Sequence, residues 1–235
     1  MDSIYDFLQE RIRTDYIQGK ILRSTDRGSI LLIRHKQTKT PYVFRQFDGS
    51  AEVYRKLLFL DCPNLPHVYE AAEKDGKAAV LEEYIEGDTM QEFLKGSLFS
   101  KEETRTIIRD LCQGLWVLHK HGAVHRDIKP ENIILRGDTA VLIDFDASRI
   151  FKKENTADTV VLGTTGFAAP EQYGMGQSDR RSDIYSLGVL MNVMLTGQHP
   201  SRNLASGRFG RVISKCTMMD PAARYDSVTE LLEAL

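Results

Sequence analysis

The feature that most restricts the fold of this chain is a change of pattern about one third of the way along it. Up to residues 83–87, short runs rich in β-branched and aromatic residues alternate with polar turns, as strands do. From Thr89 onward, apolar residues recur mainly at helical spacing. Strands followed by helices predict an α+β protein in two parts, with the join near residues 83–87. Ligand sites are common where two such parts meet.

The first part is predicted to begin with an amphipathic helix and to continue mainly as strands. The segment 50–60 has helical periodicity, and Ser50 stands where an N-cap is expected. A polar turn at residues 24–29 separates two apolar runs and predicts a hairpin. The expected helices cover residues 2–17 and 50–60, and the expected strands include 21–22, 30–33, 42–47, 67–70 and 78–84.

The second part carries two long helical patterns and one hairpin. Residues 101–120 place apolar side chains on one face, and residues 181–195 form a second, strongly apolar helix. Two apolar runs, 133–135 and 141–143, bracket a turn at Gly137 and predict a hairpin. The last helical pattern, residues 228–235, reaches the final residue, so we expect that the natural chain can continue.

Composition sets the class of protein and its expected compartment. The 235 residues are 42% hydrophobic and 27% charged, which is ordinary for a globular protein. A net charge of −2 gives no bulk attraction for nucleic acid or anionic membrane, so neither is an expected partner. Residues 1–20 lack the apolar core of a signal peptide, and no run approaches the ~20 apolar residues that span a bilayer. We therefore expect a cytoplasmic protein without membrane contact.

The three cysteines support a reducing compartment. Cys62, Cys112 and Cys216 are far apart and odd in number, and they match no metal-ligand or redox spacing. We expect three structural thiols.

The residues most informative about function form the string His-Arg-Asp-Ile-Lys-Pro-Glu-Asn at residues 125–132, followed by Asp-Phe-Asp at 144–146. Transfer of a phosphoryl group from a metal-bound nucleotide requires a group that orients the hydroxyl, a cation near the moving phosphoryl group, and oxygen ligands for Mg²⁺. Asp127, Lys129, Asn132 and Asp144 supply these groups within a short span. The predicted hairpin would bring Asn132 and Asp144 to neighbouring strand ends.

The eight-residue string resembles the catalytic loop of eukaryotic-type protein kinases, and further motifs extend the resemblance from about Leu22 to Tyr225. By this resemblance, Asp127 and Lys129 are catalytic, and Asn132 and Asp144 hold Mg²⁺ or Mn²⁺ beside ATP. Lys129 implies transfer to serine or threonine. The overall pattern, including Ala-Pro-Glu-Gln-Tyr-Gly at 169–174, looks like the bacterial serine/threonine kinases.

The resemblance also assigns scaffold residues. His125 would be a packed core histidine, Asp183 would brace the backbone of the catalytic loop, and Glu171 would form a buried ion pair with Arg224. Arg126 would pair with a phosphate on the activation segment. The expected residues of that segment are Thr156 and Thr159, which could be phosphorylated, and Thr164, which would bridge Asp127 and Lys129.

The strand-rich part departs from the family pattern. Where Gly-x-Gly-x-x-Gly is expected, the chain has Arg23, Thr25 and Gly28, so only the last glycine is kept. The strand lysine is replaced by Arg45, whose expected partner is Glu52, with Glu10 or another acid as the alternative. By resemblance, the ATP-binding residues are Leu22, Gly28, Ile30, Arg45, Glu52, Glu83, Tyr84 and Ile85.

Two more departures surround the expected ATP site. Asp146 replaces the glycine of Asp-Phe-Gly, and would stiffen that turn or add a carboxylate near the metal. Glu82 occupies the gatekeeper position and would narrow the adenine pocket. Arginine keeps the charge of lysine but differs from it in shape, and a misplacement of ~1 Å at a reacting group can cost ~10²-fold in rate. The departures therefore bear on activity rather than on family.

The sequence thus predicts a bilobal protein-kinase-like fold with a small antiparallel-sheet lobe, residues 1–84, and a larger helical lobe, residues 85–235, in one kinase domain. The expected activity is ATP-dependent phosphorylation of serine or threonine in protein substrates at a Mg-ATP site between the lobes. Two alternatives remain open. One is a pseudokinase that acts as a regulatory binding module, and the other is a small-molecule phosphotransferase.

Overall fold

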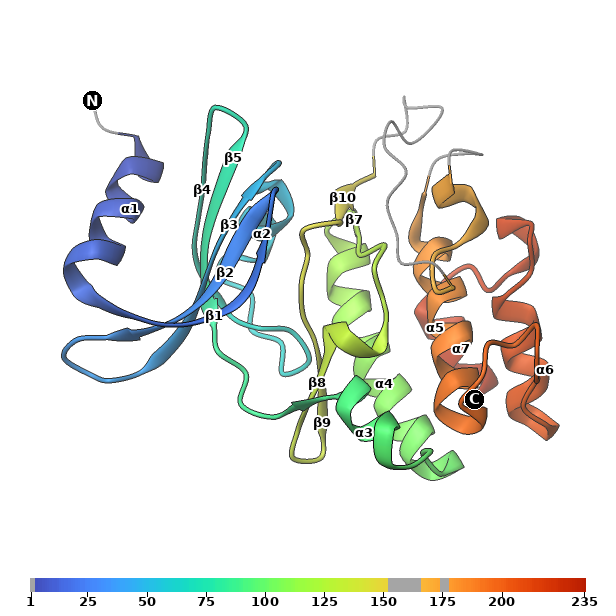
Figure 1. Cartoon of the computed structure of the whole chain (residues 1–235). Helices are drawn as coiled ribbons and strands as arrows, with labels where there is room; N and C mark the ends of the chain where they lie inside the picture. Colours follow the sequence, from blue (N-terminus) through green and yellow to red (C-terminus); the bar gives the residue numbers. More distant parts are fainter. Residues whose placement is uncertain (1–2, 152–165, 174–177) are drawn as a thin grey trace. The chain divides into compact units, whose positions relative to one another are not determined.

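The computed structural model describes residues 3–151, 166–173 and 178–235. The chain divides into two compact units. The first contains Met1–Cys62 and Pro66–Ile85, and the second contains Glu86–Leu235 together with Pro63–Leu65. Figure 1 shows strands dominating the first unit and helices the second, so the predicted α+β bilobal fold is confirmed.

The first unit is built on a five-stranded antiparallel sheet with strand order β1-β2-β3-β5-β4. Helix α1 lies against β4 and β5 (Figure 1), and α2 contacts β4. The elements of this unit are α1 (Ile4–Asp15), β1 (Tyr16–Thr25), β2 (Gly28–His35), β3 (Pro41–Asp48), α2 (Glu52–Leu57), β4 (Val68–Lys74) and β5 (Lys77–Glu83).

Helix α1 begins at Ile4 and ends at Asp15, two residues before the predicted end, and the predicted first residue lies outside the described residues. Its N-cap is Ser3, which forms a capping box with Asp6. At the other end, Tyr16 and Ile17 belong to β1, where they pair with β2. An aromatic and a β-branched residue suit a strand, and the sheet offers them hydrogen-bonding partners that a helix end lacks.

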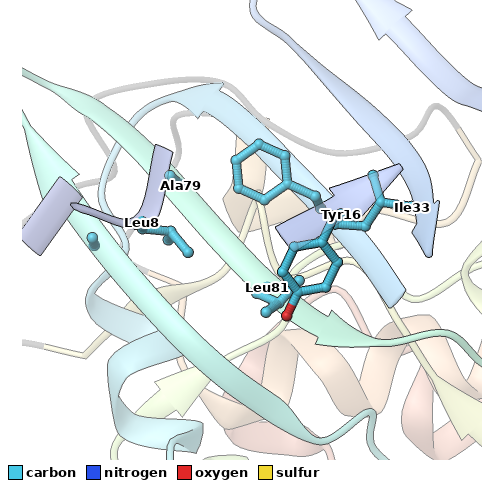
Figure 2. Close-up of a cluster of buried hydrophobic side chains, with 7 residues drawn as sticks. Leu8, Tyr16, Ile33, Ala79 and Leu81 are labelled. Carbon is cyan, nitrogen blue, oxygen red and sulfur yellow. The ribbon is translucent and has the colours of Figure 1, made fainter. Parts of the chain in front are cut away.

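Buried apolar side chains join α1 to one face of the sheet. Leu8 of α1 is 1% exposed and lies in a cluster with strand residues (Figure 2). The buried members are Leu8, Tyr16, Ile33, Phe44, Ala72, Ala79 and Leu81. The apolar stripe of α1 is therefore part of the core of the first unit.

Helix α2 also differs from its prediction. It has only six residues and its N-cap is Ala51, not Ser50. The Ser50 hydroxyl accepts a hydrogen bond from the backbone N–H of Glu52 at 3.2 Å, while the N–H of Ala51 donates to Glu73 at 3.0 Å. The helix ends early because Leu58 forms a β-bridge with Val68. A strand contact thus replaces the last predicted helical turn.

In the second unit, the two long helices occur as predicted. Helix α4 covers Lys101–Lys120 with a Ser100–Glu103 capping box, and its buried side chains include Leu111, Leu115 and Leu118. The other helices and strands of this unit are β6 (Asp88–Thr89), α3 (Met90–Gly96), β7 (Ala123–Val124), β8 (Ile133–Arg136), β9 (Thr139–Leu142), β10 (Arg149–Ile150), α5 (Arg180–Thr196), α6 (Gly207–Cys216) and α7 (Val228–Ala234). The short 3₁₀ turns of the described residues are Pro130–Asn132, Pro170–Tyr173 and Pro221–Ala223.

Two of the three cysteines, Cys112 and Cys216, are buried. Burial raises the pKa of the Cys112 and Cys216 thiols above the ordinary range, so both remain protonated at neutral pH. This fits the structural role predicted for them.

Among the described helices, none combines the length and the apolar character that crossing a bilayer requires.

Candidate active site

The backbone that leads into the catalytic string is held by one buried carboxylate. Asp183 of α5 accepts hydrogen bonds from the backbone N–H of His125 at 2.9 Å and of Arg126 at 2.8 Å. His119 of α4 lies 2.8 Å from the same carboxylate through Nε2. Asp183 is fully buried, which by itself raises its pKa, but these hydrogen bonds outweigh burial and the pKa is lowered. The bracing contact predicted for Asp183 is therefore present.

Two residues of the site have a backbone conformation that side chains disfavour. Arg126, whose N–H donates to Asp183, and Asp144 each have a φ of 70°, in the left-handed region that non-glycine residues rarely adopt. Such strain costs ~1–3 kcal/mol per residue and collects at functional sites. Asp146, at the position of the family glycine, is not among the positive-φ residues, so its side chain fits this turn without backbone strain.

Three side chains of the catalytic string contact one another. The Lys129 ammonium lies 2.7 Å from Oδ2 of Asp127, and both side chains are 14% exposed. The Asn132 amide donates to the same Asp127 oxygen and to the Asp127 carbonyl, both at 2.9 Å. The Asp127 carboxylate is thus fixed between a cation and an amide, and it is not completely buried.

The predicted hairpin brings the two candidate metal ligands to adjacent strand ends. Strands β8 and β9 pair with Ile133 opposite Leu142, and the N–H of Ile143 donates to the carbonyl of Asn132 at 2.9 Å. Asn132 and Asp144 are therefore held near the same end of the hairpin.

The chemistry of these two side chains suits a hard cation. Because the amide nitrogen of Asn132 faces Asp127, its oxygen is turned to the other side. An amide oxygen and a carboxylate are ligands that suit Mg²⁺, which usually takes one or two protein ligands and completes its shell with water and phosphate oxygens. Asn132 and Asp144 therefore fit the metal that the sequence predicts.

His125 is placed as a structural residue rather than a base. It is fully buried, and burial lowers the pKa of its ring, so it is neutral at pH 7. Its Nδ1 accepts from the backbone N–H of Asp127 at 3.3 Å, and its ring packs edge-on against Phe145 at 5.4 Å. The neutral ring thus helps to set the position of Asp127.

A second scaffold contact is the predicted ion pair of Glu171 and Arg224. The guanidinium donates to both carboxylate oxygens, at 2.7 and 2.9 Å, and its side chain is fully buried. It also donates to the carbonyl of Arg181 at 2.9 Å. The pair therefore joins the segment Pro170–Tyr173 to the start of α5 and to the segment before α7.

The sequence did not single out Gln172, which the structure places at a junction. Its amide donates to the carbonyl of Arg126 at 2.8 Å, and its oxygen accepts from the N–H of Ala169 at 3.1 Å. The side chain is fully buried. The only sequence signal was its position beside Glu171, because a single buried glutamine that links two segments leaves no periodic pattern in the sequence.

In the first unit, the β1–β2 hairpin is tighter than predicted. Thr25 pairs directly with Gly28, so the turn consists of Asp26 and Arg27. A Cβ on Gly28 would lie 2.0 Å from the carbonyl oxygen of Gln46. The close approach of β3 therefore explains why glycine is needed at this position, whatever its role toward phosphate.

The partner of Arg45 differs from the predicted one. Its Nε and Nη2 lie 2.9 and 2.8 Å from Oε1 of Glu82, and both side chains are 3% exposed. The expected ion pair was with Glu52, at the start of α2. That expectation was wrong because the sheet register, which the sequence does not reveal, places Glu82 within reach of Arg45.

The other predicted nucleotide residues lie on β1, β2 and the end of β5. Leu22 is 43% exposed on β1, and Ile30 is half-buried on β2 opposite Arg23 and Arg45. After β5, Tyr84 is half-buried and Ile85 is buried. Glu83 accepts from the N–H of His67 at 3.2 Å. Their contact with ATP stays a prediction.

Three predicted residues of the activation segment, Thr156, Thr159 and Thr164, lie outside the described residues. Their phosphorylation, the pairing of Arg126 with a phosphate and the bridging role of Thr164 stay predictions. Within the described part of the chain, Lys129 and Asp127 are already in direct contact.

Comparison with known proteins identifies the family. Residues 28–232 match the protein kinase domain model. Over 225 residues, 86% of the chain, the sequence is 32% identical to serine/threonine-protein kinase D of Synechocystis. It is also 32% identical to serine/threonine-protein kinase PknA of Nostoc over 73% of the chain, and 27% identical to PknB of Mycobacterium tuberculosis over 88%.

The aligned part spans less than half of each of these relatives: 44% of the Synechocystis protein, 35% of the Nostoc protein and 34% of the mycobacterial protein. The match thus concerns a domain that these longer proteins share. With the braced catalytic loop, the β8–β9 hairpin and the Glu171–Arg224 pair in place, the chain belongs to the protein kinase domain family.

Proposed function

We propose that this chain phosphorylates serine and threonine hydroxyls of protein substrates with ATP. The observation that carries the proposal is the cluster of Asp127, Lys129 and Asn132, in which one carboxylate oxygen lies 2.7 Å from the ammonium and 2.9 Å from the amide. The serine/threonine kinases among its relatives support the choice of acceptor. The local basis for that choice is Lys129.

In the proposed reaction, the substrate hydroxyl oxygen bonds to the γ-phosphorus while the bond to the bridging oxygen of ADP breaks. Asp127 orients the hydroxyl and accepts its proton. Lys129 stabilises the charge on the transferred phosphoryl group, and for this its ammonium must contact the γ-phosphate. In the proposed reaction it does so while it remains in contact with Asp127. An ammonium carries three donors, so Lys129 can keep its 2.7 Å contact with Asp127 while it donates to a phosphate oxygen.

Asn132 and Asp144 would hold Mg²⁺ or Mn²⁺ through an amide oxygen and a carboxylate. When bound, the metal ion neutralises charge on the nucleotide phosphates. The hydrogen bonds from Asn132 to Asp127 link this ligand to the proposed base. The two functions are therefore positioned by the same short loop.

The nucleotide is proposed to contact Leu22, Gly28, Ile30, Arg45, Glu52, Glu83, Tyr84 and Ile85. Arg45 would carry the phosphate role of the family lysine. Its guanidinium keeps a positive charge at any physiological pH, but presents it as a planar fork rather than as a point charge. The binding geometry for phosphate therefore differs from that of a lysine enzyme.

The direct test is transfer of radiolabelled phosphate from ATP to the chain itself or to a generic protein substrate, followed by identification of the phosphorylated amino acid. Asp127→Asn should lower the rate by ~10²–10⁴-fold, because the amide cannot accept the proton. Asp138→Asn, in the exposed turn between β8 and β9, is the matched control and should leave the rate unchanged.

Absence of transfer above the Asp127→Asn background, with folded protein and either metal ion, would contradict the proposal. Nucleotide binding without turnover would then favour a regulatory binding module. A phosphorylated small molecule without any phosphoprotein would favour the phosphotransferase alternative.

A further inference from the structure

Arg45 and Glu82 lie on neighbouring strands, in positions that place their side chains on one face of the sheet. Arg45 of β3 stands opposite Val80 of β5, and Glu82 is two residues further along β5. Diagonal neighbours of this kind are within reach of long side chains. The opposite face carries Phe44 and Leu81, which belong to the same buried cluster as Leu8 of α1.

The contact between the two side chains is close and buried. One oxygen of Glu82 lies 2.9 Å from Nε and 2.8 Å from Nη2 of Arg45. Each residue is 3% exposed. A buried charge that lost its partner would be strongly destabilising, so this pair strongly restricts the conformation of both side chains.

Helix α2 contributes a ring to Arg45. Tyr54 is fully buried, and its ring centroid lies 5.6 Å from Cζ of Arg45, within the range of a cation–π contact. The same ring packs against Phe47 of β3. The carboxylate that orients the guanidinium therefore comes from β5, while α2 supplies an aromatic wall.

An arginine can hold a carboxylate and a second anion with different edges of one planar group. The guanidinium has five N–H donors in a fixed geometry, and the two short contacts to Glu82 use the Nε and Nη2 side. Because the guanidinium is planar and rigid, holding its Nε and Nη2 side also fixes the direction of its other N–H donors. A lysine ammonium can rotate about its bond, so one contact does not fix its other donors in this way. A glutamate bound in this way can therefore aim the cation.

We propose that Glu82 is the positioning residue of Arg45 and that it takes the part that the sequence assigns to Glu52 of α2. This inference rests on the proposed function, because Arg45 is taken to bind nucleotide phosphate. The orientation of the cation is then set within the sheet, by β3 and β5, and depends less on where the six-residue helix α2 lies. Glu52 is correspondingly less important than Glu82.

The test compares three glutamate-to-glutamine variants in the whole chain. Glu82→Gln removes the charge beside Arg45, and Glu52→Gln removes the charge that the sequence predicts as its partner. Glu70→Gln removes a strand carboxylate that contacts Arg11 of α1, and is the matched control. The measurements are kcat and KM for Mg-ATP, direct binding of ATP and of adenosine, and the thermal unfolding midpoint of each variant.

Glu82→Gln should lower kcat/KM for Mg-ATP by about tenfold or more, since a misaligned cation loses transition-state contacts. It should weaken ATP binding more than adenosine binding, because only ATP has the phosphates that Arg45 would contact. If Glu82 only stabilised the sheet, its substitution would weaken the binding of ATP and of adenosine to the same extent. Glu52→Gln should have the smaller effect, and Glu70→Gln should resemble wild type in kcat, KM and the binding of both ligands.

If Glu82→Gln does not fold, Glu82→Asp keeps the charge but moves it one methylene away from Arg45. This variant should also weaken ATP binding more than adenosine binding. An active wild type with Glu82 variants that bind ATP normally, or with a larger loss in Glu52→Gln, overturns this inference alone. A folded wild type that binds no Mg-ATP overturns the proposed function and this inference together.

Discussion

At the scale of single residues, Glu171 and Arg224 show how burial changes the contribution of an ion pair to stability. The Arg224 side chain is fully buried and donates to two carboxylate oxygens and to backbone carbonyls. The pair of Glu92 and Lys95 has a similar distance, 2.7 Å, but its side chains are 56% and 62% exposed. Water competes for the exposed pair and not for the buried one.

We therefore expect Glu171→Gln to lower the free energy of unfolding by ~3–5 kcal/mol, because it leaves a buried guanidinium without a countercharge. Glu92→Gln should lower it by less than ~1 kcal/mol. Urea unfolding of the two variants at pH 7 measures both changes. Equal effects would show that the buried pair adds nothing beyond what a surface pair contributes.

At the scale of elements, α1 precedes the residues that match the family model, 28–232, yet it is packed into the first unit. Leu8 contributes a buried side chain to the sheet core (Figure 2). Asp6 contacts Lys74 of β4 at 2.6 Å, and Arg11 contacts Glu70 of the same strand. Apolar packing and charge pairs therefore fix the helix on the same face of the sheet.

Leu8→Ala should lower the free energy of unfolding by ~2–5 kcal/mol, since it leaves a cavity between α1 and the sheet. Ile4→Ala is the matched control, because Ile4 is 77% exposed, and it should change stability by less than ~0.5 kcal/mol. Urea unfolding followed by far-UV circular dichroism compares the two. A Leu8→Ala variant as stable as the control would mean that α1 is only loosely attached.

At the scale of the whole molecule, burial of His125 links stability to pH. Its pKa is held below the ordinary value of 6.5 in the folded chain, so the unfolded chain binds the proton more readily. The contribution of His125 to stability is fully present above pH 6.5 and is lost progressively as the pH falls below that value. His199 also has a lowered pKa, from burial and from Arg202, but its side chain is less buried.

The free energy of unfolding should therefore be lower at about pH 5.5 than at about pH 7.5, and His125→Gln should reduce this difference more than His199→Gln does. Urea titrations of wild type and both variants at the two pH values provide the measurement. If the difference is the same in all three proteins, His125 does not carry the pH dependence.

Much of this protein could be predicted without its structure because the signals are local. The α4 bounds follow from apolar spacing and from the Ser100–Glu103 capping box. The β8–β9 hairpin follows from two apolar runs around Gly137. The catalytic string is contiguous, so its groups were recognisable together before any tertiary contact was known.

The predictions that failed concern ends of elements and partners across strands. Tyr16 joined β1, and α2 lost its last turn to a bridge between Leu58 and Val68, because pairing with another strand outweighed local helical periodicity. Gln172 carried no pattern that would mark a buried junction. In each case the deciding interaction is a tertiary contact with another segment: Tyr16 with His35, Leu58 with Val68, and Gln172 with Arg126.

The sequence by itself determined the family, the division into a strand-rich and a helix-rich part, and the candidate catalytic residues, since each of these depends on neighbouring residues. Only the tertiary structure decided that Arg45 pairs with Glu82 rather than Glu52. The physical reason is the register of β3 and β5, which sets Glu82 on the same face as Arg45 and within reach of its guanidinium. A shift of one residue would have turned Glu82 toward the opposite face.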